Sequence, residues 1–249
     1  MRVKKKASRP KPPRRILVID VGGSNVKFRV GDHGKIKKCP SGPKMSAAEM
    51  VEQVRRLTAN TPYDAVSIGY PGLVFRDKIA AEPYNLGGGW VGFDFGKAFG
   101  KPVRVINDAA MQAIGSYTGG RMLFLGLGTG LGATLIIDGV VEPMEIGHMP
   151  YKHGRSFEDY VGKRALERFG TKKWRKEVSD VVDQLKKALE VAYVVLGGGN
   201  AKRLKRLPKD TRLGDNLNAF VGGPLIWQES DTPLVLSSPH RSRVAVGKK

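Results

Sequence analysis

Apolar residues in the first half of the chain fall into short runs that end at glycine or at a polar residue, a pattern typical of strands. The runs that predict strands cover residues 16–20, 26–30, 64–70 and 103–106. The first two flank a glycine turn, which predicts that they pair. Ser46 followed by Glu49 forms a capping box and predicts an amphipathic helix that runs to about Ala59. Another helix is expected to start near Ala109.

The same order of elements starts again in the second half. Strands are predicted at 122–127, 133–137 and 193–196. The first two again flank a glycine turn, Gly-Thr-Gly-Leu-Gly. Helices are predicted near 157–169 and over 174–190, and a basic helix is expected after Gly197-Gly198-Gly199-Asn200. Two such halves imply an α/β protein whose two similar domains face a cleft.

The domain organisation follows from this repeat and from the composition of the ends. We expect domains at 15–115 and 116–229. The Lys/Arg/Pro-rich residues 1–14 predict a disordered basic tail, and residues 230–249 predict a second flexible tail.

Hydropathy and cysteine content narrow the class of protein. No apolar run approaches the ~20 residues that span a membrane, and the basic N-terminus lacks the apolar core of a secretory signal. The single cysteine, Cys39, permits neither an intrachain disulfide nor a cysteine-based zinc site. These features favour a cytoplasmic protein.

The formal net charge of +20 is concentrated in four segments. Residues 1–15 and 241–249 supply twelve of the charges, and the folded region holds basic clusters at 163–176 and 202–212. Each internal cluster is compatible with a solvated helix face or with a track for a polyanion. Specific nucleic-acid binding is not expected, because no recognition motif of a known kind is present.

The glycine turns point to phosphate binding. Glycine lets phosphate approach the main chain, whose N–H groups form an anion nest. The candidate phosphate and nucleotide residues are Asp20, Gly22, Gly23, Ser24, Asn25, Lys27, Gly128, Thr129, Gly130, Gly198 and Gly199. Asp20 is also the candidate Mg²⁺ ligand. The alternatives are plain hairpin turns and, for Lys27, a strand residue facing solvent.

The chain also carries five motifs whose residues and order resemble those of the ROK sugar kinases of the actin-like ATPase superfamily. They are Asp-Val-Gly-Gly-Ser-Asn-Val-Lys (20–27), Ile-Asn-Asp-Ala (106–109), Leu-Gly-Leu-Gly-Thr-Gly-Leu-Gly (125–132), Glu-Ile-Gly-His (145–148) and Val-Leu-Gly-Gly-Gly-Asn-Ala (195–201). The resemblance runs from about residue 16 to 227 and is strongest to the polyphosphate/ATP glucokinases of that family.

This resemblance implies a fold and an activity. The fold is two actin-like ATPase (ribonuclease H-like) domains around a central cleft. The activity is transfer of a phosphoryl group from inorganic polyphosphate, and also from ATP, to the 6-hydroxyl of glucose, an entry step of glycolysis. A Mg²⁺ ion and a homodimer are implied as well.

The resemblance also assigns the acceptor site. Asp108 is the general base in this assignment; the alternative is that it only caps the helix that follows. The sugar-binding residues are Gly72, Asn85, Asn107, Asp108, Glu145, His148 and Glu158. Each of three residues also has an alternative role. Asn85 could only stabilise its own loop, Glu158 could only complement the dipole of a helix, and His148 could be structural.

One departure from the family pattern concerns metal. Typical ROK members carry a cysteine-rich zinc motif after Glu-x-Gly-His, whereas this chain continues Met-Pro-Tyr-Lys-His-Gly-Arg without cysteine. We therefore expect no zinc, and a pair formed by His148 and His153 is poor evidence for a metal site. The polyphosphate glucokinases resemble this chain in that respect.

The sequence leaves the donor and the class of activity open. The third glycine turn favours ATP, whereas the basic clusters favour polyphosphate. The rivals are a strictly ATP-dependent glucokinase or other hexose kinase, a ROK transcriptional repressor, and a sugar-binding protein without activity. A repressor would need a winged-helix domain, for which the 15 residues before the first strand are too few.

Overall fold

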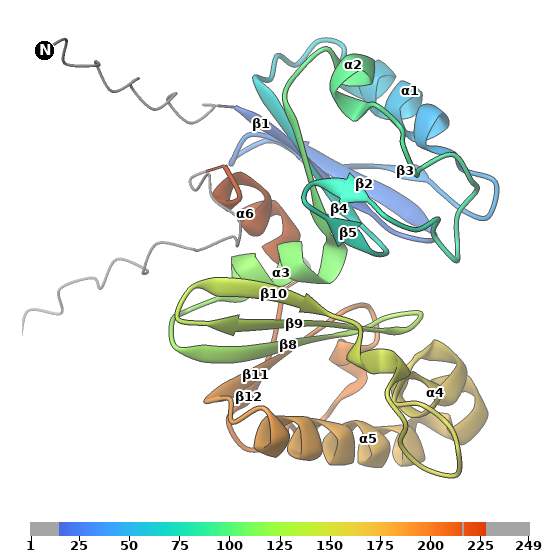
Figure 1. The fold of residues 1–249 in the computed structure, drawn as a ribbon, viewed down its shortest axis with the longest axis vertical. Helices are drawn as coiled ribbons and strands as arrows, with labels where there is room; N and C mark the ends of the chain where they lie inside the picture. The colour runs from blue at the N-terminus through green and yellow to red at the C-terminus, as the bar shows by residue number, and fades with distance from the viewer. Residues whose placement is uncertain (1–14, 216, 228–249) are drawn as a thin grey trace, which may run out of the picture.

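A computed structural model describes residues 15–215 and 217–227, and it folds them into two α/β halves stacked along the long axis of the molecule (Figure 1). The expected tails at 1–14 and 230–249 lie outside the described residues. Within the described part, no helix is long and apolar enough to cross a membrane.

The first half is built on a five-stranded sheet of order β3-β2-β1-β4-β7. Its strands are β1 (Ile16–Val21), β2 (Asn25–Val30), β3 (Lys37–Pro40), β4 (Ala65–Tyr70) and β7 (Val103–Asn107). The β1–β2–β3 pairs are antiparallel, whereas β4 and β7 run parallel to β1. The carboxyl ends of β1, β4 and β7 therefore meet at one edge, the usual place for a ligand site in such sheets.

Two helices and a small hairpin complete this half. The helix α1 (Ala47–Thr58) has the capping box expected from Ser46 and Glu49, with both reciprocal hydrogen bonds present. No pattern in the sequence predicted α2 (Phe95–Phe99) or the hairpin of β5 (Val74–Phe75) and β6 (Lys78–Ile79). These elements are only two to five residues long, too short to show a clear period.

The second half repeats the topology of the first, with sheet order β10-β9-β8-β11-β12. Its strands are β8 (Arg121–Leu127), β9 (Leu131–Ile137), β10 (Val140–Met144), β11 (Tyr193–Gly197) and β12 (Thr211–Leu213). The first three strands are again antiparallel neighbours, and β11 and β12 run parallel to β8. The expected repeat of strand, glycine turn and strand is confirmed.

The helices of the second half differ in detail from the expected ones. A short α4 (Glu158–Val161) precedes α5 (Lys163–Ala188), which is interrupted at Gly170, where φ is 72°. The basic helix expected after Asn200 is wrong: a 3-10 turn, η2 (Ala201–Arg203), leads into an irregular segment. Pro208 lies in that segment and is incompatible with a helix interior.

Two helices lie between the sheets (Figure 1), α3 (Asp108–Ser116) and α6 (Asn218–Leu225). They pack backbone to backbone, because a Cβ on Gly115 would overlap the carbonyl oxygen of Asn218 and one on Gly222 would overlap that of Met111. Through Gly223, α6 also lies against Val18 of β1. The last described helix thus packs on the sheet of the first half, although the expected domain 116–229 contains it.

Candidate active site

Asp108 lies where β7 ends and α3 begins. The helix is capped by Asn107, whose Oδ1 accepts a hydrogen bond from the Ala110 N–H at 3.1 Å. The alternative that Asp108 is the cap is therefore wrong. The carboxylate of Asp108 accepts a hydrogen bond from the adjacent Ala109 N–H at 2.7 Å.

Two further acidic residues surround Asp108. Burial, and then the negative charge of Asp20, raise the pKa of Asp108 to about 7, and Glu145 adds to the shift. The N–H of Ala109 opposes it. Asp20 lies on β1, one residue before its end, whereas Glu145 follows β10 in the other half. The structure thus brings three predicted site residues from both halves around one space.

The first glycine turn joins β1 to β2. Its Gly22 N–H donates to the Asn25 carbonyl at 3.1 Å. The Lys27 ammonium lies 3.9 Å from Asp20 Oδ2, and burial raises the pKa of Asp20 while Lys27 partly offsets it. Lys27 therefore faces the site, not solvent alone.

Two neighbours complete the first turn. A Cβ on Gly23 would lie 3.2 Å from Cβ of Asn85, so the predicted sugar residue Asn85 borders the turn. The Ser41 hydroxyl donates to the Gly22 carbonyl at 2.5 Å, and the Ser41 N–H donates to the Ser24 carbonyl at 3.1 Å. Ser41 was not predicted as a site residue, because only the pairing of β2 with β3 brings it to this turn.

The second turn is joined to a predicted sugar residue. The Leu131 N–H donates to Glu158 Oε2 at 3.0 Å, and a Cβ on Gly130 would overlap the same carboxylate. Glu158 does stand in the first turn of α4, but its carboxylate is engaged with the turn between β8 and β9. Gly128 opens to free space, since a Cβ there would meet nothing within 4 Å.

The third turn packs against the second. Gly198 has φ of 82°, and a Cβ on it would lie 2.6 Å from the carbonyl oxygen of Leu127. The Asn200 N–H donates to the Leu127 carbonyl at 3.0 Å, and its Nδ2 donates to the Gly128 carbonyl at 3.1 Å. Asn200 belongs to the recognised motif, but its role as a bridge between the two turns was not predicted.

The remaining predicted sugar-binding residues are Gly72, Asn107 and His148. Asn107 Nδ2 donates to the Gly72 carbonyl at 3.1 Å, which joins these two predicted residues. His148 ends the 3-10 turn η1 (Ile146–His148) and is exposed. In the part of the chain that the structure describes, no three His, Cys, Asp or Glu side chains gather as a metal site.

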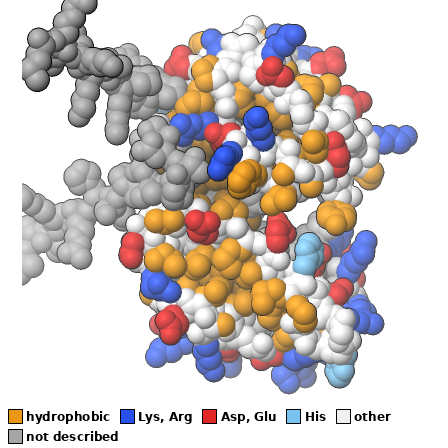
Figure 2. All heavy atoms as spheres, in the orientation of Figure 1, with side chains coloured by type: hydrophobic (Ala, Val, Ile, Leu, Met, Phe, Trp, Pro, Cys, Tyr) orange, Lys and Arg blue, Asp and Glu red, His pale blue; other side chains and the backbone are white. Residues whose placement is uncertain are grey.

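The two internal basic clusters are brought together. Arg175 Nε, on α5, donates to the carbonyl of Arg203 at 2.7 Å, and Lys186 Nζ donates to that of Lys209 at 3.0 Å. The irregular segment therefore lies along α5. Lysine and arginine side chains gather at the lower edge of the molecule in Figure 2, where α5 lies. We call eight of the exposed members the basic band: Lys172, Lys173, Lys176, Lys202, Arg203, Lys205, Arg206 and Lys209.

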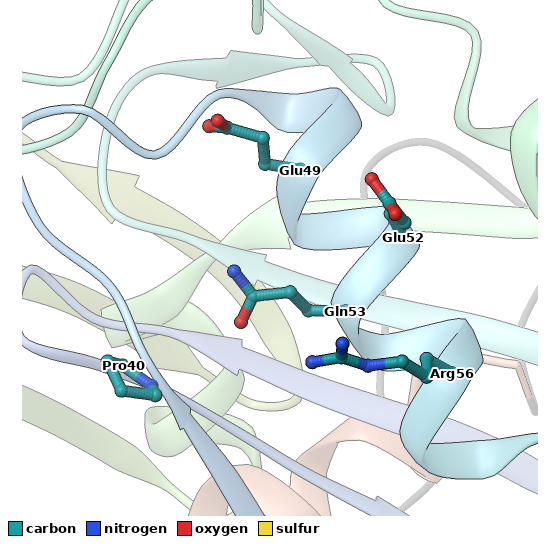
Figure 3. A pocket seen from close by; sticks show the side chains of 5 residues that line it. All are labelled: Pro40, Glu49, Glu52, Gln53 and Arg56. Carbon is teal, nitrogen blue, oxygen red and sulfur yellow. The ribbon is translucent and has the colours of Figure 1, made fainter.

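A hollow of about 400 Å³ lies elsewhere, between α1 and β3 (Figure 3). It is lined by Pro40, Glu49, Glu52, Gln53 and Arg56. None of these is a predicted site residue, and Glu49 is engaged in the capping box. This hollow is therefore separate from the site around Asp108.

The repeated sheets, each opening with a strand, a glycine turn and a second strand, define a protein of the actin-like ATPase fold. The model of the ROK family matches residues 16–163, more than half of the chain, and the chain belongs to the ROK family. Both the expected fold class and the expected family are thus confirmed.

Known relatives are similar at low identity. Polyphosphate glucokinase of Mycobacterium tuberculosis (strain CDC 1551 / Oshkosh) is 25% identical over 210 residues, which cover 74% of this chain and 77% of the relative. Kanosamine kinase of Amycolatopsis mediterranei is 32% identical over 162 residues, covering 55% and 53%. The crystal structure of an inorganic polyphosphate/ATP-glucomannokinase from Arthrobacter sp. strain KM superposes with a TM-score of 0.74 at 23% identity, covering 84% and 96%.

Proposed function

We propose that this protein is a sugar kinase that transfers a phosphoryl group from polyphosphate to the 6-hydroxyl of glucose. The observation that carries the proposal is the position of Asp108, whose burial and whose neighbours Asp20 and Glu145 raise its pKa to about 7. A general base is most effective when its pKa is near the working pH.

In the proposed reaction Asp108 accepts the proton of the sugar hydroxyl. The hydroxyl oxygen forms a bond to the terminal phosphorus of the donor, and the bond from that phosphorus to its bridging oxygen breaks. The shortened donor leaves with the electron pair of the broken bond. The turns at Gly22–Gly23 and Gly128–Gly130 would hold the donor phosphates through backbone N–H groups.

The acceptor would be held by side chains from both halves. Asn85 and Asn107 come from the first half, and Glu145, His148 and Glu158 from the second. Carboxylates and amides can each bond two neighbouring hydroxyls. The coupling of Asn107 to Gly72 and of Glu158 to Leu131 supports their placement at the site.

A Mg²⁺ ion fits the donor side. The carboxylate of Asp20 is 14% exposed, and its desolvation, which raises its pKa, would be relieved by a cation. Mg²⁺ commonly binds through one or two carboxylates together with substrate phosphates. When bound, the ion would neutralise charge on the transferred phosphoryl group.

The basic band supports polyphosphate as the donor. It brings together cations from α5 and from the segment after η2, although about 30 residues separate them in the sequence. A polymer with about one charge per phosphate gains from a long cationic surface as nucleic acid does. The names of the similar polyphosphate kinases agree with this choice.

A panel of donors and sugars tests the proposal. Purified protein is assayed with polyphosphate or ATP and with glucose, mannose, kanosamine or N-acetylmannosamine. Glucose phosphorylated faster with polyphosphate than with ATP supports the proposal. Faster turnover with ATP, or with another hexose, supports the rival hexose kinases, and sugar binding without turnover supports a regulator.

The proposal also covers the cellular location and the oligomeric state of the protein. We place the reaction in the cytoplasm at the entry of glucose into glycolysis, and we expect a homodimer. Light scattering coupled to size-exclusion chromatography tests the dimer.

A further inference from the structure

A compact hairpin joins two proposed sugar-binding residues. It starts directly after His148 and ends directly before Glu158. The Phe157 N–H donates to the Met149 carbonyl at 3.1 Å, and the Tyr151 N–H donates to the Arg155 carbonyl at 2.7 Å.

The tip of the hairpin is a tight turn. It bends at His153 and Gly154, with φ of 51° and 68°. The Arg155 N–H donates across it to the Lys152 carbonyl at 3.0 Å. Positive φ at two successive residues is typical of a type I′ turn. The backbone of this segment is therefore fixed within itself, so it can move as one unit.

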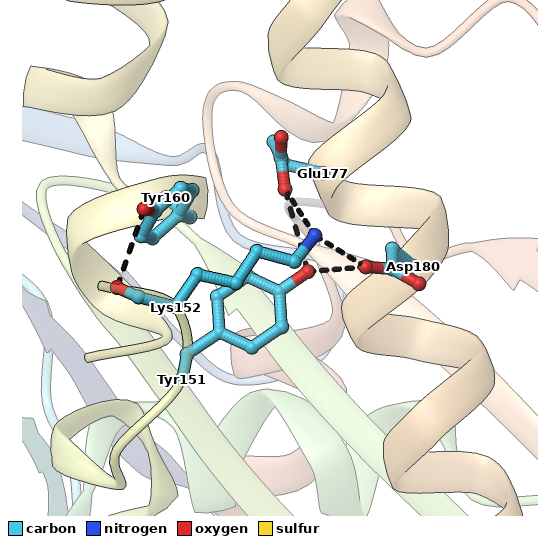
Figure 4. A network of polar contacts seen from close by, with 5 residues as sticks. All are labelled: Tyr151, Lys152, Tyr160, Glu177 and Asp180. Carbon is cyan, nitrogen blue, oxygen red and sulfur yellow. Dashed lines mark hydrogen bonds and ion pairs between the residues drawn. The ribbon is translucent and has the colours of Figure 1, made fainter. Parts of the chain in front are cut away.

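The hairpin is attached to α5 by a polar cluster, drawn in Figure 4. Lys152 Nζ lies 2.6 Å from Asp180 Oδ2 and 3.0 Å from Glu177 Oε2. The Tyr151 hydroxyl donates to the same carboxylate of Asp180 and lies 3.3 Å from that of Glu177. We call these four residues the clamp.

The charged residues of the clamp stabilise one another in their ionised forms. The hydrogen bond to Lys152 lowers the pKa of Asp180, and that to Asp180 raises the pKa of Lys152, so both stay ionised at neutral pH. The Glu177 side chain is 13% exposed, so it depends on Lys152 for compensation of its charge.

An aromatic cluster carries the position of the hairpin to Glu158. The ring centroid of Tyr151 lies 5.0 Å from those of Phe157 and Tyr160. In the sequence, these two residues stand before and after Glu158. The Tyr160 hydroxyl donates to the Lys152 carbonyl at 3.3 Å. A displacement of Tyr151 and Lys152 would therefore displace the backbone at Glu158.

We propose that the clamp of Tyr151, Lys152, Glu177 and Asp180 positions His148 and Glu158 for sugar binding. Lys152 is then a positioning residue that acts on the sugar through the hairpin. This inference rests on the proposed function, because it takes His148 and Glu158 as sugar ligands.

The test replaces Lys152 by methionine, which keeps the unbranched stem of the side chain and removes the ammonium group with its charge. At saturating donor, Lys152→Met is expected to raise the KM for glucose about tenfold, as loss of a charged hydrogen bond does, with kcat changed less than twofold. Lys152→Arg, which restores the charge, recovers the KM. Lys37→Met is the matched control, since Lys37 makes a similar 2.7 Å contact with the Leu57 carbonyl in the other half.

Two further measurements separate positioning from stability. Hydrogen exchange in the peptide 149–157 is expected to speed up in Lys152→Met and to stay unchanged in Lys37→Met. The double variant Lys152→Met/Asp180→Asn is expected to have the KM of the single variant, since coupled residues act non-additively. An unchanged KM for glucose in Lys152→Met, or fully additive effects in the double variant, overturns the inference.

Failure of the proposed function is recognised separately. If the wild-type protein phosphorylates no hexose, calorimetry with glucose decides the inference. Weaker glucose binding by Lys152→Met than by the wild type supports it, and equal or absent binding overturns it.

Discussion

The negative charge of Asp20 helps to raise the pKa of Asp108 to about 7, and only the burial of Asp108 contributes more to this shift. Asp20 is the second-last residue of β1 and Asp108 directly follows β7, and the two meet because both strands end at the same edge of the sheet. A carboxylate tuned in this way changes its protonation within the physiological range.

The pH dependence of turnover should report this relationship. Since Asp108 must be ionised to accept a proton, kcat/KM is expected to fall as pH falls through about 7. Asp20→Asn removes a like charge, so the acid limb of its profile should move to lower pH. An acid limb at the same pH in this variant would contradict the assigned source of the shift.

Asp108→Asn tests the base and also has a consequence for stability. Loss of the base should lower kcat by roughly 10²–10⁴-fold with either donor, while glucose still binds in calorimetry. Near-normal turnover would exclude Asp108 as the base.

The sign of the stability change follows from the raised pKa. Between the unfolded value near 4 and about 7, the folded state binds the extra proton, so ionisation of Asp108 destabilises the wild-type protein as pH rises. At pH 8 the neutral variant should therefore melt at a higher temperature, by about 2–4 °C for each 1 kcal/mol gained. At pH 4 the two melting temperatures should converge.

Two glycines of the second turn should separate sugar binding from donor binding. In Gly130→Ala the new Cβ overlaps the Glu158 carboxylate, so the KM for glucose should rise by about tenfold or more, equivalent to about 1.4 kcal/mol. In Gly128→Ala the Cβ enters open space where phosphate is expected, so the KM for the donor should rise instead. Equal effects of both variants on both KM values would count against the assignment.

The basic band should distinguish polyphosphate from ATP. Replacing Lys172, Lys173 and Lys176 by glutamine should raise the KM for polyphosphate roughly tenfold and flatten its dependence on salt, since fewer phosphate charges are neutralised. The KM for ATP should change much less. Lys35, Lys37 and Lys38 near β3 provide a triple control of equal charge loss in the other half. A similar change for both donors would rule out a polymer track.

The cap of α1 gives a test of stability away from the site. Ser46→Ala removes the acceptor for the Glu49 N–H and should cost about 1 kcal/mol, observed as a lower midpoint in urea with an unchanged slope. Glucose KM and kcat are expected to stay unchanged. A clear fall in kcat or rise in the glucose KM of the folded variant would show that α1 affects the site.

The sequence by itself determined the parts whose cause is local. The glycine turns, the capping box at Ser46 and the strand that leads to Asp108 depend on residues within a few positions, and the structure confirms them. The order of the motifs also determined the family. Short or exposed strands such as β3 and β12 gave no such signal, and the basic helix expected after Asn200 did not form.

Only the tertiary structure decided which of these parts meet. The contact of Glu158 with Leu131, the bridge from Arg175 to Arg203 and the attachment of Lys152 to Asp180 each span more than 20 residues of sequence. The return of α6 to β1 spans about 200. Such contacts arise from sheet order and helix packing, which depend on all the residues buried together, so no local pattern in the chain encodes them.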